Sequence, residues 1–259
     1  MTALIGILNL TPDSFSDGGI YHTRTRALAH CVHLIADGAD IIDVGAESTR
    51  PGAAPLSSAQ EWERLEPLLA EIIDMAHTAK RRVSLDTYHP QNAKRAIDLN
   101  IDWINDVSGL THPDMIALAR STTVPFVVMH HLGIPASKQT TLSEDQNPVT
   151  VVKDWITHTI ARLKHAGINP DRLVFDPGIG FGKTATQSIK LIQQIEDLMA
   201  CSVPLLVGHS RKSFLPVLYP DMTSPDEATL AVSRQLVQKG VAFLRVHDIA
   251  MHRAILPIN

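Results

Sequence analysis

Eight short runs of apolar residues, spread along the whole chain, constrain the fold more than any other feature of the sequence. The runs are nearly continuous in Ile, Val and Leu, which is typical of strands that are buried on both faces. They occupy residues 4–10, 41–46, 83–87, 103–107, 125–130, 173–177, 205–209 and 241–247. Longer amphipathic segments separate them, for example at residues 59–76, 149–166 and 186–199. The pattern therefore predicts strands that alternate with helices.

Residues that commonly end or begin helices flank these segments. Gly38 and Gly167 follow two of them, and Pro113, Pro148 and Pro225 stand where others begin. Eight strands alternating with helices over about 250 residues are typical of a (β/α)8 TIM barrel. A doubly wound open sheet is the alternative, but it more often carries a dinucleotide-binding fingerprint after its first strand. Here that turn reads T-P-D-S-F-S-D-G-G, so we expect one α/β barrel domain over residues 1–259.

The composition excludes several classes of protein. With 44% hydrophobic residues, the chain can bury a sizeable core. The 23 Lys and Arg against 27 Asp and Glu give a net charge of −4, which argues against a nucleic-acid or anionic membrane partner. Cys31 and Cys201 cannot build a disulfide framework, and the first ten residues do not have the pattern of a secretory signal. We therefore expect a soluble, cytoplasmic protein.

Nearly every expected strand ends in a side chain that can take part in chemistry. In strand order these are Asn9, Asp43 with Glu47, Asp86, Asn105 with Asp106, His130, Asp176, His209 with Ser210, and Arg245 with His247. Polar residues at such places can simply mark where buried strands meet water. A set this complete, mostly carboxylates, amides and histidines, instead favours a ligand-binding mouth, because barrel enzymes keep their active sites at this end of the strands.

Two of the expected mouth loops are rich in small and polar residues. The first, residues 11–19, carries Asp13 and Asp17 and ends in two glycines. We expect a mobile lid there, with an ordinary turn as the alternative. The second loop reads E-S-T-R-P-G over residues 47–52. Its Arg50 is either a ligand-binding group or a solvated surface charge.

The loop after the sixth strand, D-P-G-I-G-F-G-K-T at residues 176–184, has some features of a phosphate-binding loop but not its spacing. A P-loop needs four residues between its first glycine and Gly-Lys, whereas Gly178 leaves three. Pro177 also has no amide hydrogen to offer a phosphate, which argues against a nucleoside triphosphatase. Arg245 and His247 are two residues apart on the last expected strand, so their side chains lie on the same face. Two such cationic or donor groups on one face favour a phosphate-type anion as the ligand.

Seven motifs in one order resemble the dihydropteroate synthase family. They run from residue 7 to residue 248 and read I-L-N-L-T-P-D-S-F-S-D-G-G, I-D-V-G-A-E-S-T-R-P-G, S-L-D-T, I-N-D-V-S-G, D-P-G-I-G-F-G-K, V-G-H-S-R-K-S-F and R-V-H-D. The resemblance implies a (β/α)8 barrel that joins 6-hydroxymethyl-7,8-dihydropterin pyrophosphate to p-aminobenzoate and releases pyrophosphate. It also implies Mg²⁺ as cofactor, a homodimer, a place in folate synthesis and a target of sulfonamides.

The resemblance also implies roles for individual residues. The pterin would be held by Asp86, Asn105, Met129, Asp176, Lys212 and Arg245. Pyrophosphate would be bound by Asn9, Arg245 and His247, with Asn9 also a ligand of Mg²⁺. The p-aminobenzoate pocket would comprise Phe15, Thr49, Pro51, Phe181, Lys212 and Ser213, with Asp13, Asp17 and Arg50 on mobile loops. The catalytic residues would be Asp86, Lys212, Arg245 and His247.

A few positions depart from the family pattern. Tyr88 and His89 follow S-L-D-T where a small residue and lysine are frequent, His131 replaces a common methionine, and residues 134–146 form an unusual fifth loop. Two other functions remain possible at this point. A pterin-binding methyltransferase domain of the corrinoid type would need neither the first motif nor R-V-H. A non-catalytic pterin-binding protein should have lost Asn9, Arg245 or His247.

Overall fold

The computed structural model describes residues 2–11, 20–49, 52–137 and 139–256, with only the backbone described at 20–23. Eight strands form one sheet in the order β6-β5-β4-β3-β2-β1-β8-β7, and every pair is parallel. The strands are β1 Ala3–Asn9, β2 Ile41–Gly45, β3 Arg82–Asp86, β4 Trp103–Asp106, β5 Phe126–Met129, β6 Leu173–Asp176, β7 Leu206–Val207 and β8 Phe243–Val246. All eight strands expected from the apolar runs are confirmed.

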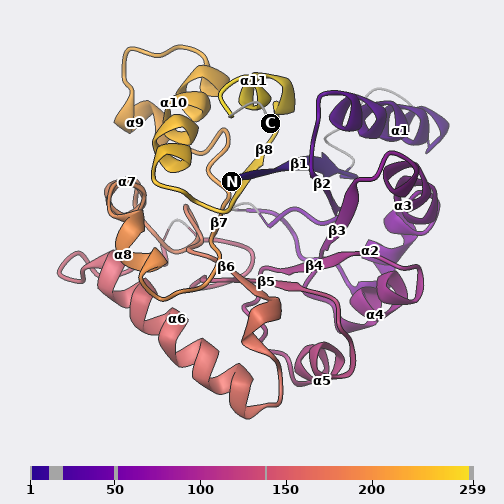
Figure 1. Cartoon of the computed structure of the whole chain (residues 1–259), viewed down its shortest axis with the longest axis horizontal. Coiled ribbons are helices and arrows are strands. Elements are labelled where there is room, and N and C mark those ends of the chain that lie inside the picture. The colour runs from indigo at the N-terminus through magenta and orange to yellow at the C-terminus, as the bar shows by residue number, and fades with distance from the viewer. Residues whose placement is uncertain (1, 12–19, 50–51, 138, 257–259) are drawn as a thin grey trace.

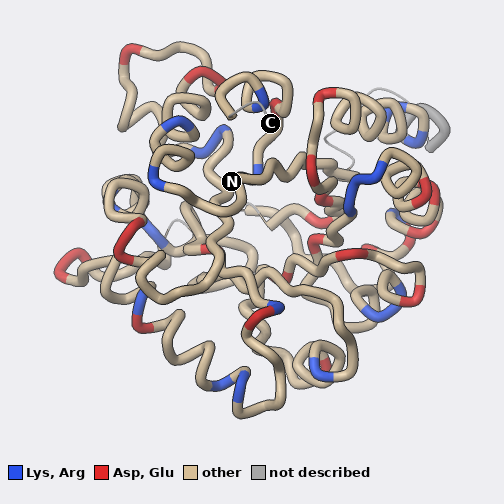
Figure 2. Tube along the Cα trace, in the orientation of Figure 1, with Lys and Arg blue, Asp and Glu red and all other residues tan. Residues whose placement is uncertain are grey.

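The sheet closes into a barrel where β6 meets the residues just before β7. Phe175 forms an isolated parallel bridge with Leu205, and its backbone N–H donates to the carbonyl of Pro204 at 2.9 Å. Helices surround the strands in Figure 1, as expected for a (β/α)8 TIM barrel. Figure 2 shows acidic and basic residues interspersed over these outer helices.

The helices follow the strands in chain order. They are α1 Ile20–Ala36, α2 Ser58–Leu65, α3 Leu69–Thr78, α4 Pro90–Asp98, α5 Pro113–Ser121, α6 Pro148–His165, α7 Ala185–Gln193, α8 Ile195–Met199, α9 Leu215–Leu218, α10 Pro225–Gln238 and α11 Ile249–Arg253, with a 3₁₀ turn at Pro170–Arg172. Within the described residues, no helix has the length and apolar character needed to cross a membrane.

Most of the expected helix boundaries are confirmed. Gly38 and Gly167 adopt φ of 91° and 83° just beyond α1 and α6, and proline begins α5, α6 and α10. Two segments that were each expected to form one helix form two helices instead. Residues 59–76 are interrupted by Pro67, whose missing N–H and ring disfavour a continuous helix, and residues 186–199 divide at Gln194 into α7 and α8.

Alternation along the strands creates two separate apolar layers. One set of side chains packs outward against the helices. The other fills the barrel interior and consists of Ile5, Ile41, Trp103, Val127, Val174 and Leu206, with Phe243 packed against them. Side chains two or four residues further along each strand therefore also point inward, toward the C-terminal mouth.

Candidate active site

The upper layer of the barrel brings together polar residues from neighbouring strands. Asn9 pairs in register with Gly45, Gly45 with Asp86, and Asp86 with Asn105, across β1, β2, β3 and β4. Gly45 carries no side chain in this row, and a Cβ there would contact both neighbours, at 3.5 Å from the Asp86 Cβ and 3.7 Å from the Asn9 Oδ1. The row therefore places the Asn9 amide and the Asp86 carboxylate on either side of Gly45.

Asp43 lies one layer below this row and connects three strands. Its Oδ2 accepts a hydrogen bond from Arg245 Nε at 2.5 Å and one from Asn105 Nδ2 at 3.2 Å. Arg245 also donates to Asp86 Oδ2 at 2.9 Å. Asp43 is only 1% exposed, and its Oδ1 has no hydrogen-bond partner among the described residues. Arg245 is thus fixed between two carboxylates at the floor of the mouth.

Burial changes the protonation of the carboxyl groups in this layer. It raises the pKa of Asp86 to about 7; the Arg245 guanidinium opposes this, and the carboxyl of Asp43 adds to it. Burial likewise raises the pKa of Asp176, against the attraction of Lys212. A carboxyl group with a pKa near 7, as at Asp86, can accept a hydrogen bond when ionised and donate one when protonated, which suits a heterocycle carrying both donors and acceptors.

The loop after β6 adds an aromatic ring to the mouth, and the loop after β7 adds a cation. Asp176 pairs in register with Met129, and its Oδ1 accepts a hydrogen bond from Gly178 N at 2.7 Å. Lys212 donates from Nζ to the carbonyl of Ile179, and the same Nζ lies 4.8 Å from the centre of the Phe181 ring. These contacts place Lys212 and Phe181 together.

Gly178 explains why this loop is rich in glycine. Its φ is +66°, and a Cβ at this position would lie 1.8 Å from the carbonyl oxygen of His130. A larger residue would meet both the backbone strain and the clash. The close approach of residues 176–183 to the end of β5 therefore depends on this glycine.

The seventh and eighth strands supply a hydroxyl and an imidazole. Ser210 Oγ and His247 Nδ1 are 2.8 Å apart, and the backbone N–H of His247 donates to the same hydroxyl at 3.3 Å. The pair fixes the imidazole two residues beyond Arg245 on the same strand face. Ser213 lies in the following loop and is exposed.

Three strand-end residues expected at the mouth face the helices instead, since each is one position out of phase with the inward side chains. Asp106 accepts hydrogen bonds from the backbone N–H groups of Ser108 and Leu110 at 2.8 and 3.1 Å. His130 contacts Lys183 Nζ at 2.8 Å. His209 contacts Ser233 of α10 at 2.7 Å. The expectation of a mouth residue from the end of every strand is therefore wrong for these three side chains.

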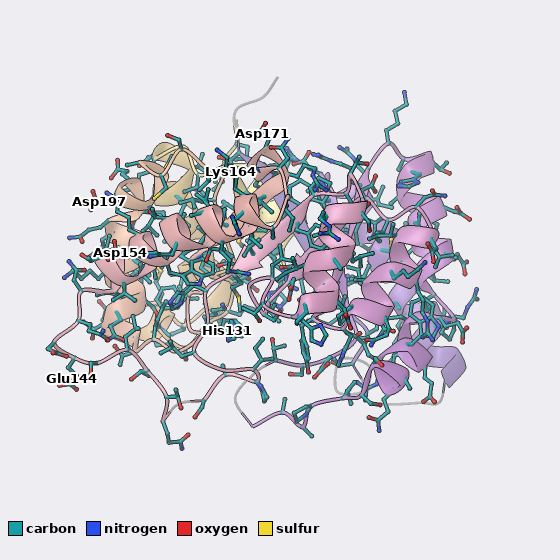
Figure 3. The ribbon with its side chains drawn as sticks, turned by 90° about the horizontal axis from the view of Figure 1, so that it is seen from below. His131, Glu144, Asp154, Lys164, Asp171 and Asp197 are labelled. Atoms are coloured by element: carbon teal, nitrogen blue, oxygen red, sulfur yellow. The ribbon has the colours of Figure 1, made fainter. Side chains whose placement is uncertain are left out.

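The long loop after β5 lies between the second and sixth mouth loops. The backbone N–H of Ala136 donates to the carbonyl of Thr49 at 3.1 Å, and that of Leu142 donates to Gly182 at 3.0 Å. Figure 3 shows His131 and Glu144, which belong to this loop, in the lower half of the view, opposite Asp171 and Lys164 in the upper half. The loop therefore lies on the mouth side, and it connects with Thr49.

The structure brings together most of the residues singled out from sequence, while their individual roles stay predictions. Those on the inward faces of the strands at the mouth and its floor are Asn9, Asp86, Asn105, Met129, Asp176 and Arg245, with Thr49, Phe181, Lys212, Ser213 and His247 in the adjoining loops and strand end. Those outside the described residues are Asp13, Phe15, Asp17, Arg50 and Pro51.

Two further residues lie at the site although the motifs assign them no role. Asp43 was one of several polar strand residues, but its inward position, two residues before Gly45, places it against Arg245. Lys183 closes the glycine-rich motif, is 6% exposed and donates to the carbonyl of Phe181 at 2.9 Å. Burial lowers the pKa of Lys183 to about 7. Strand alternation could have identified Asp43, whereas Lys183 required the folded loop.

Comparison with known proteins agrees with this arrangement. Residues 5–247 match the family described as pterin binding enzyme. The chain is 39% identical to a folate synthesis bifunctional protein of Chlamydia muridarum, over 98% of this chain but 58% of that protein. It is 36% identical to a dihydropteroate synthase of Synechocystis, over 96% of this chain and 86% of the relative. The chain thus spans little more than half of the bifunctional relative.

Two solved structures are also similar. Dihydropteroate synthase from Anaplasma phagocytophilum with bound 6-hydroxymethylpterin-monophosphate has a TM-score of 0.89 and 36% identity, covering 98% of this chain and 96% of that one. The Xanthomonas albilineans dihydropteroate synthase with 4-aminobenzoic acid has a TM-score of 0.88 and 34% identity, covering 98% and 90%. Fold and sequence therefore point to the same group of proteins.

Proposed function

The chain belongs to the pterin-binding enzyme family, and from this we propose that it is a dihydropteroate synthase. It would be a transferase that joins 6-hydroxymethyl-7,8-dihydropterin pyrophosphate to p-aminobenzoate in folate synthesis. The observation that carries the proposal is the inward layer of Asp86, Asn105, Asp176 and Arg245, with Lys212 beside it. The pterin monophosphate and aminobenzoate in the related structures support the same two substrates.

The carboxyl and amide groups of the upper layer suit the pterin ring. An aminopyrimidinone edge presents both N–H donors and acceptor atoms, and Asp86, Asn105 and Asp176 offer acceptors and an amide donor. The raised pKa of Asp86 lets this carboxyl take either charge state near neutral pH. As positive charge spreads over the ring when the bond to pyrophosphate breaks, an ionised Asp86 would stabilise it.

The pyrophosphate would lie at the cationic side of the mouth. Arg245 of β8 and His247, which directly follows β8, have their side chains on the same face. The hydrogen bond between His247 and Ser210 orients the imidazole. The Arg245 guanidinium is held by Asp43 and Asp86, so it is already in place before the anion binds. Such preorganised groups stabilise the charge that grows on a leaving anion.

The amine of p-aminobenzoate would then attack the methylene carbon beside the pterin. Because this amine is neutral and nucleophilic, the attack needs no strong general base. Phe181 and Lys212, joined by their 4.8 Å cation–ring contact, would contact the benzoate ring and its carboxylate. Thr49, held by Ala136, and Ser213 would complete this pocket on the described part of the chain.

The residues present fit the Mg²⁺ ion that the family resemblance implies. Asn9 offers an amide oxygen beside Asp86 at the mouth. Among the described residues, no three His, Cys, Asp or Glu side chains cluster as a metal site. Mg²⁺ typically keeps several waters and uses one or two protein ligands together with phosphate oxygens. Asn9 would therefore hold the ion jointly with the pyrophosphate, whose negative charge the ion would offset.

The location and assembly of the protein are also proposals. We propose that it works in the cytoplasm as a homodimer. The free Cys31 and Cys201 agree with a reducing compartment. The family resemblance supports the dimer. Light scattering on the purified protein at several concentrations tests it, and a mass equal to one chain throughout would contradict it.

Pyrophosphate release with each component omitted in turn tests the proposed reaction. Release should require the dihydropterin pyrophosphate, p-aminobenzoate and Mg²⁺ together, with dihydropteroate formed in equal amount. Asp86→Asn should abolish most of it. Asp98→Asn is the matched control, because its side chain is 61% exposed on α4. Pterin binding without turnover would instead indicate a non-catalytic binding protein, and methyl transfer from a reduced pterin would indicate the corrinoid type of enzyme.

A further inference from the structure

One buried carboxylate joins the second and third mouth loops. The Glu47 side chain is 5% exposed, and its Oε1 accepts hydrogen bonds from the backbone N–H of Leu56 at 3.0 Å and from the Tyr88 hydroxyl at 2.6 Å. Its Oε2 lies 3.2 Å from His89 Nε2. Glu47 therefore connects the end of β2 with Leu56 and with the segment after β3.

The segment that carries Tyr88 and His89 is itself fixed from behind. Thr87 donates from Oγ1 to Glu61 Oε2 at 2.7 Å and accepts a hydrogen bond from the backbone N–H of His89 at 3.1 Å. Glu61 belongs to α2, is 1% exposed and also accepts from Asn92 Nδ2 at 2.6 Å. Tyr88 and His89 thus rest on a buried hydrogen-bond network and can hold Glu47 firmly.

The charge of Glu47 is suited to this role. Burial tends to raise the pKa of its carboxyl, but the hydrogen bonds from His89, Tyr88 and the Leu56 N–H, together with the charge of His89, leave the pKa below its ordinary value. Glu47 is therefore ionised at neutral pH. Hydrogen bonds to an ionised acceptor are shorter and stronger than those between neutral groups.

We propose that Glu47 is a positioning residue for the p-aminobenzoate pocket, and that Tyr88 and His89 hold it in place. The inference rests on the proposed function, because it assigns Thr49 to that pocket. Thr49 is two residues beyond Glu47, and its carbonyl accepts the Ala136 N–H at 3.1 Å. Its position is thus determined by Glu47 on one side and by the fifth loop on the other. Tyr88 and His89, which depart from the family pattern, are this chain's own means of fixing the second loop.

A purely structural role and a positioning role make different predictions for the two substrates. Asp86 is held within β3 and by Arg245, so the pterin contacts should survive when Glu47 loses its donors. The loop that carries Thr49 should instead lose its position in these variants. A positioning role therefore predicts a defect for p-aminobenzoate alone.

The experiment compares Glu47→Gln, Tyr88→Phe, His89→Ala and His89→Gln. In Glu47→Gln and Tyr88→Phe, KM for p-aminobenzoate should rise at least about tenfold, the scale of one lost hydrogen bond to a charged group. KM for the dihydropterin pyrophosphate should stay within about twofold, well below that scale. His89→Gln keeps a donor and should resemble wild type more than His89→Ala does. Tyr219→Phe is the control, because it removes another phenol hydroxyl, one that contacts Gln235 at 2.7 Å.

Amide hydrogen exchange and p-aminobenzoate binding are measured without turnover, so they are informative even if wild type forms no dihydropteroate. Exchange at the Leu56 and Ala136 amides should accelerate at least about tenfold in Glu47→Gln, with weaker p-aminobenzoate binding. Wild-type exchange and affinity in both Glu47→Gln and Tyr88→Phe would overturn the proposal. Equal rises in both KM values with a lower Tm would also overturn it, because they would indicate a general loss of structure.

Discussion

Arg245 and Asp43 lie 202 residues apart in the chain, yet the Arg245 Nε is 2.5 Å from the Asp43 Oδ2. The same carboxylate oxygen accepts a hydrogen bond from Asn105. Asp43 therefore orients two residues that the proposed reaction places against the pterin. A deeply buried carboxylate in this position acts through its neighbours, because its own side chain is 1% exposed.

Substitution of Asp43 should impair catalysis in proportion to the hydrogen bonds removed. Asp43→Asn keeps one acceptor oxygen but loses the charge beside Arg245, so kcat/KM should fall at least about tenfold. Asp43→Ala leaves two buried donors without this partner and should also lower the free energy of unfolding by about 1–3 kcal/mol. Steady-state kinetics and urea denaturation check both. Wild-type kcat/KM in a folded Asp43→Asn would show that Arg245 and Asn105 need no such support.

Asp86→Asn and Arg245→Ala should affect different parts of the substrate. Loss of either preorganised contact should reduce kcat/KM at least about a hundredfold. Asp86→Asn should weaken binding of a pterin analogue that carries no phosphate, whereas Arg245→Ala should weaken binding of pyrophosphate more than of that analogue. Calorimetric titration with each ligand measures the difference. Equal affinity of Asp86→Asn and wild type for the analogue would remove Asp86 from the pterin site.

Arg245→Ala should also be less stable than Asp86→Asn. It leaves Asp43 and Asp86 close together without the guanidinium between them, and removing one partner of a buried ion pair is strongly destabilising. Asp86→Asn removes a buried charge and leaves the stronger Asp43 contact in place. Thermal unfolding of both variants should give the lower Tm for Arg245→Ala, and the reverse order would contradict this account of the charges.

The titration of Asp86 should lower the stability of the protein and raise its activity as pH increases. Burial raises its pKa from 3.8 to about 7, so the folded protein keeps a proton that the unfolded chain releases. The stabilisation is full below about pH 4 and is lost as pH rises through about 7. The ionised form is the one that stabilises positive charge on the pterin, so kcat/KM should rise over the upper part of this range.

Two variants separate the contribution of Asp86 to these pH profiles from that of Asp106. Burial raises the pKa of Asp106 to about 6. Asp86→Asn should flatten the decline of stability between about pH 4 and 7. Asp106→Asn should change the stability profile but leave the pH midpoint of kcat/KM in place, because Asp106 faces away from the mouth. The midpoint is measured from kcat/KM between pH 5 and 9. A midpoint that shifts in Asp106→Asn would show that the titration belongs to Asp106 and not to Asp86.

The apolar runs were sufficient to predict all eight strands, since buried parallel strands leave a strong local signal. Side-chain direction was harder to predict. The sequence places His130 and His209 at strand ends as readily as Asp176, but one residue of phase turns them toward Lys183 and Ser233. The single helix expected at residues 59–76 is two because of Pro67, a local signal that the amphipathic pattern obscured.

The contacts of Arg245 could not be predicted from the sequence in the same way. Its pairing with Asp43 depends on the register between β1, β2 and β8, and no local pattern encodes that register. The network of Glu47, Tyr88 and His89 likewise joins loops from different strands. Interactions between distant segments of the chain thus account for most of what the motifs alone did not reveal.

Gly178→Ala should be much more damaging than the same change at a glycine with similar backbone geometry. At Gly178, with φ of +66°, a Cβ would lie 1.8 Å from the His130 carbonyl oxygen, whereas at Gly240, with φ of +81°, the nearest atom is 3.8 Å away. Gly240→Ala should therefore cost only the backbone strain, about 1–3 kcal/mol. Gly178→Ala adds the clash and should displace residues 176–183, lowering pterin affinity as well as Tm. Urea denaturation and binding of a phosphate-free pterin analogue measure the two effects. Similar losses in both variants would show that the loop can move away from His130 at little cost, and that its path does not position Asp176.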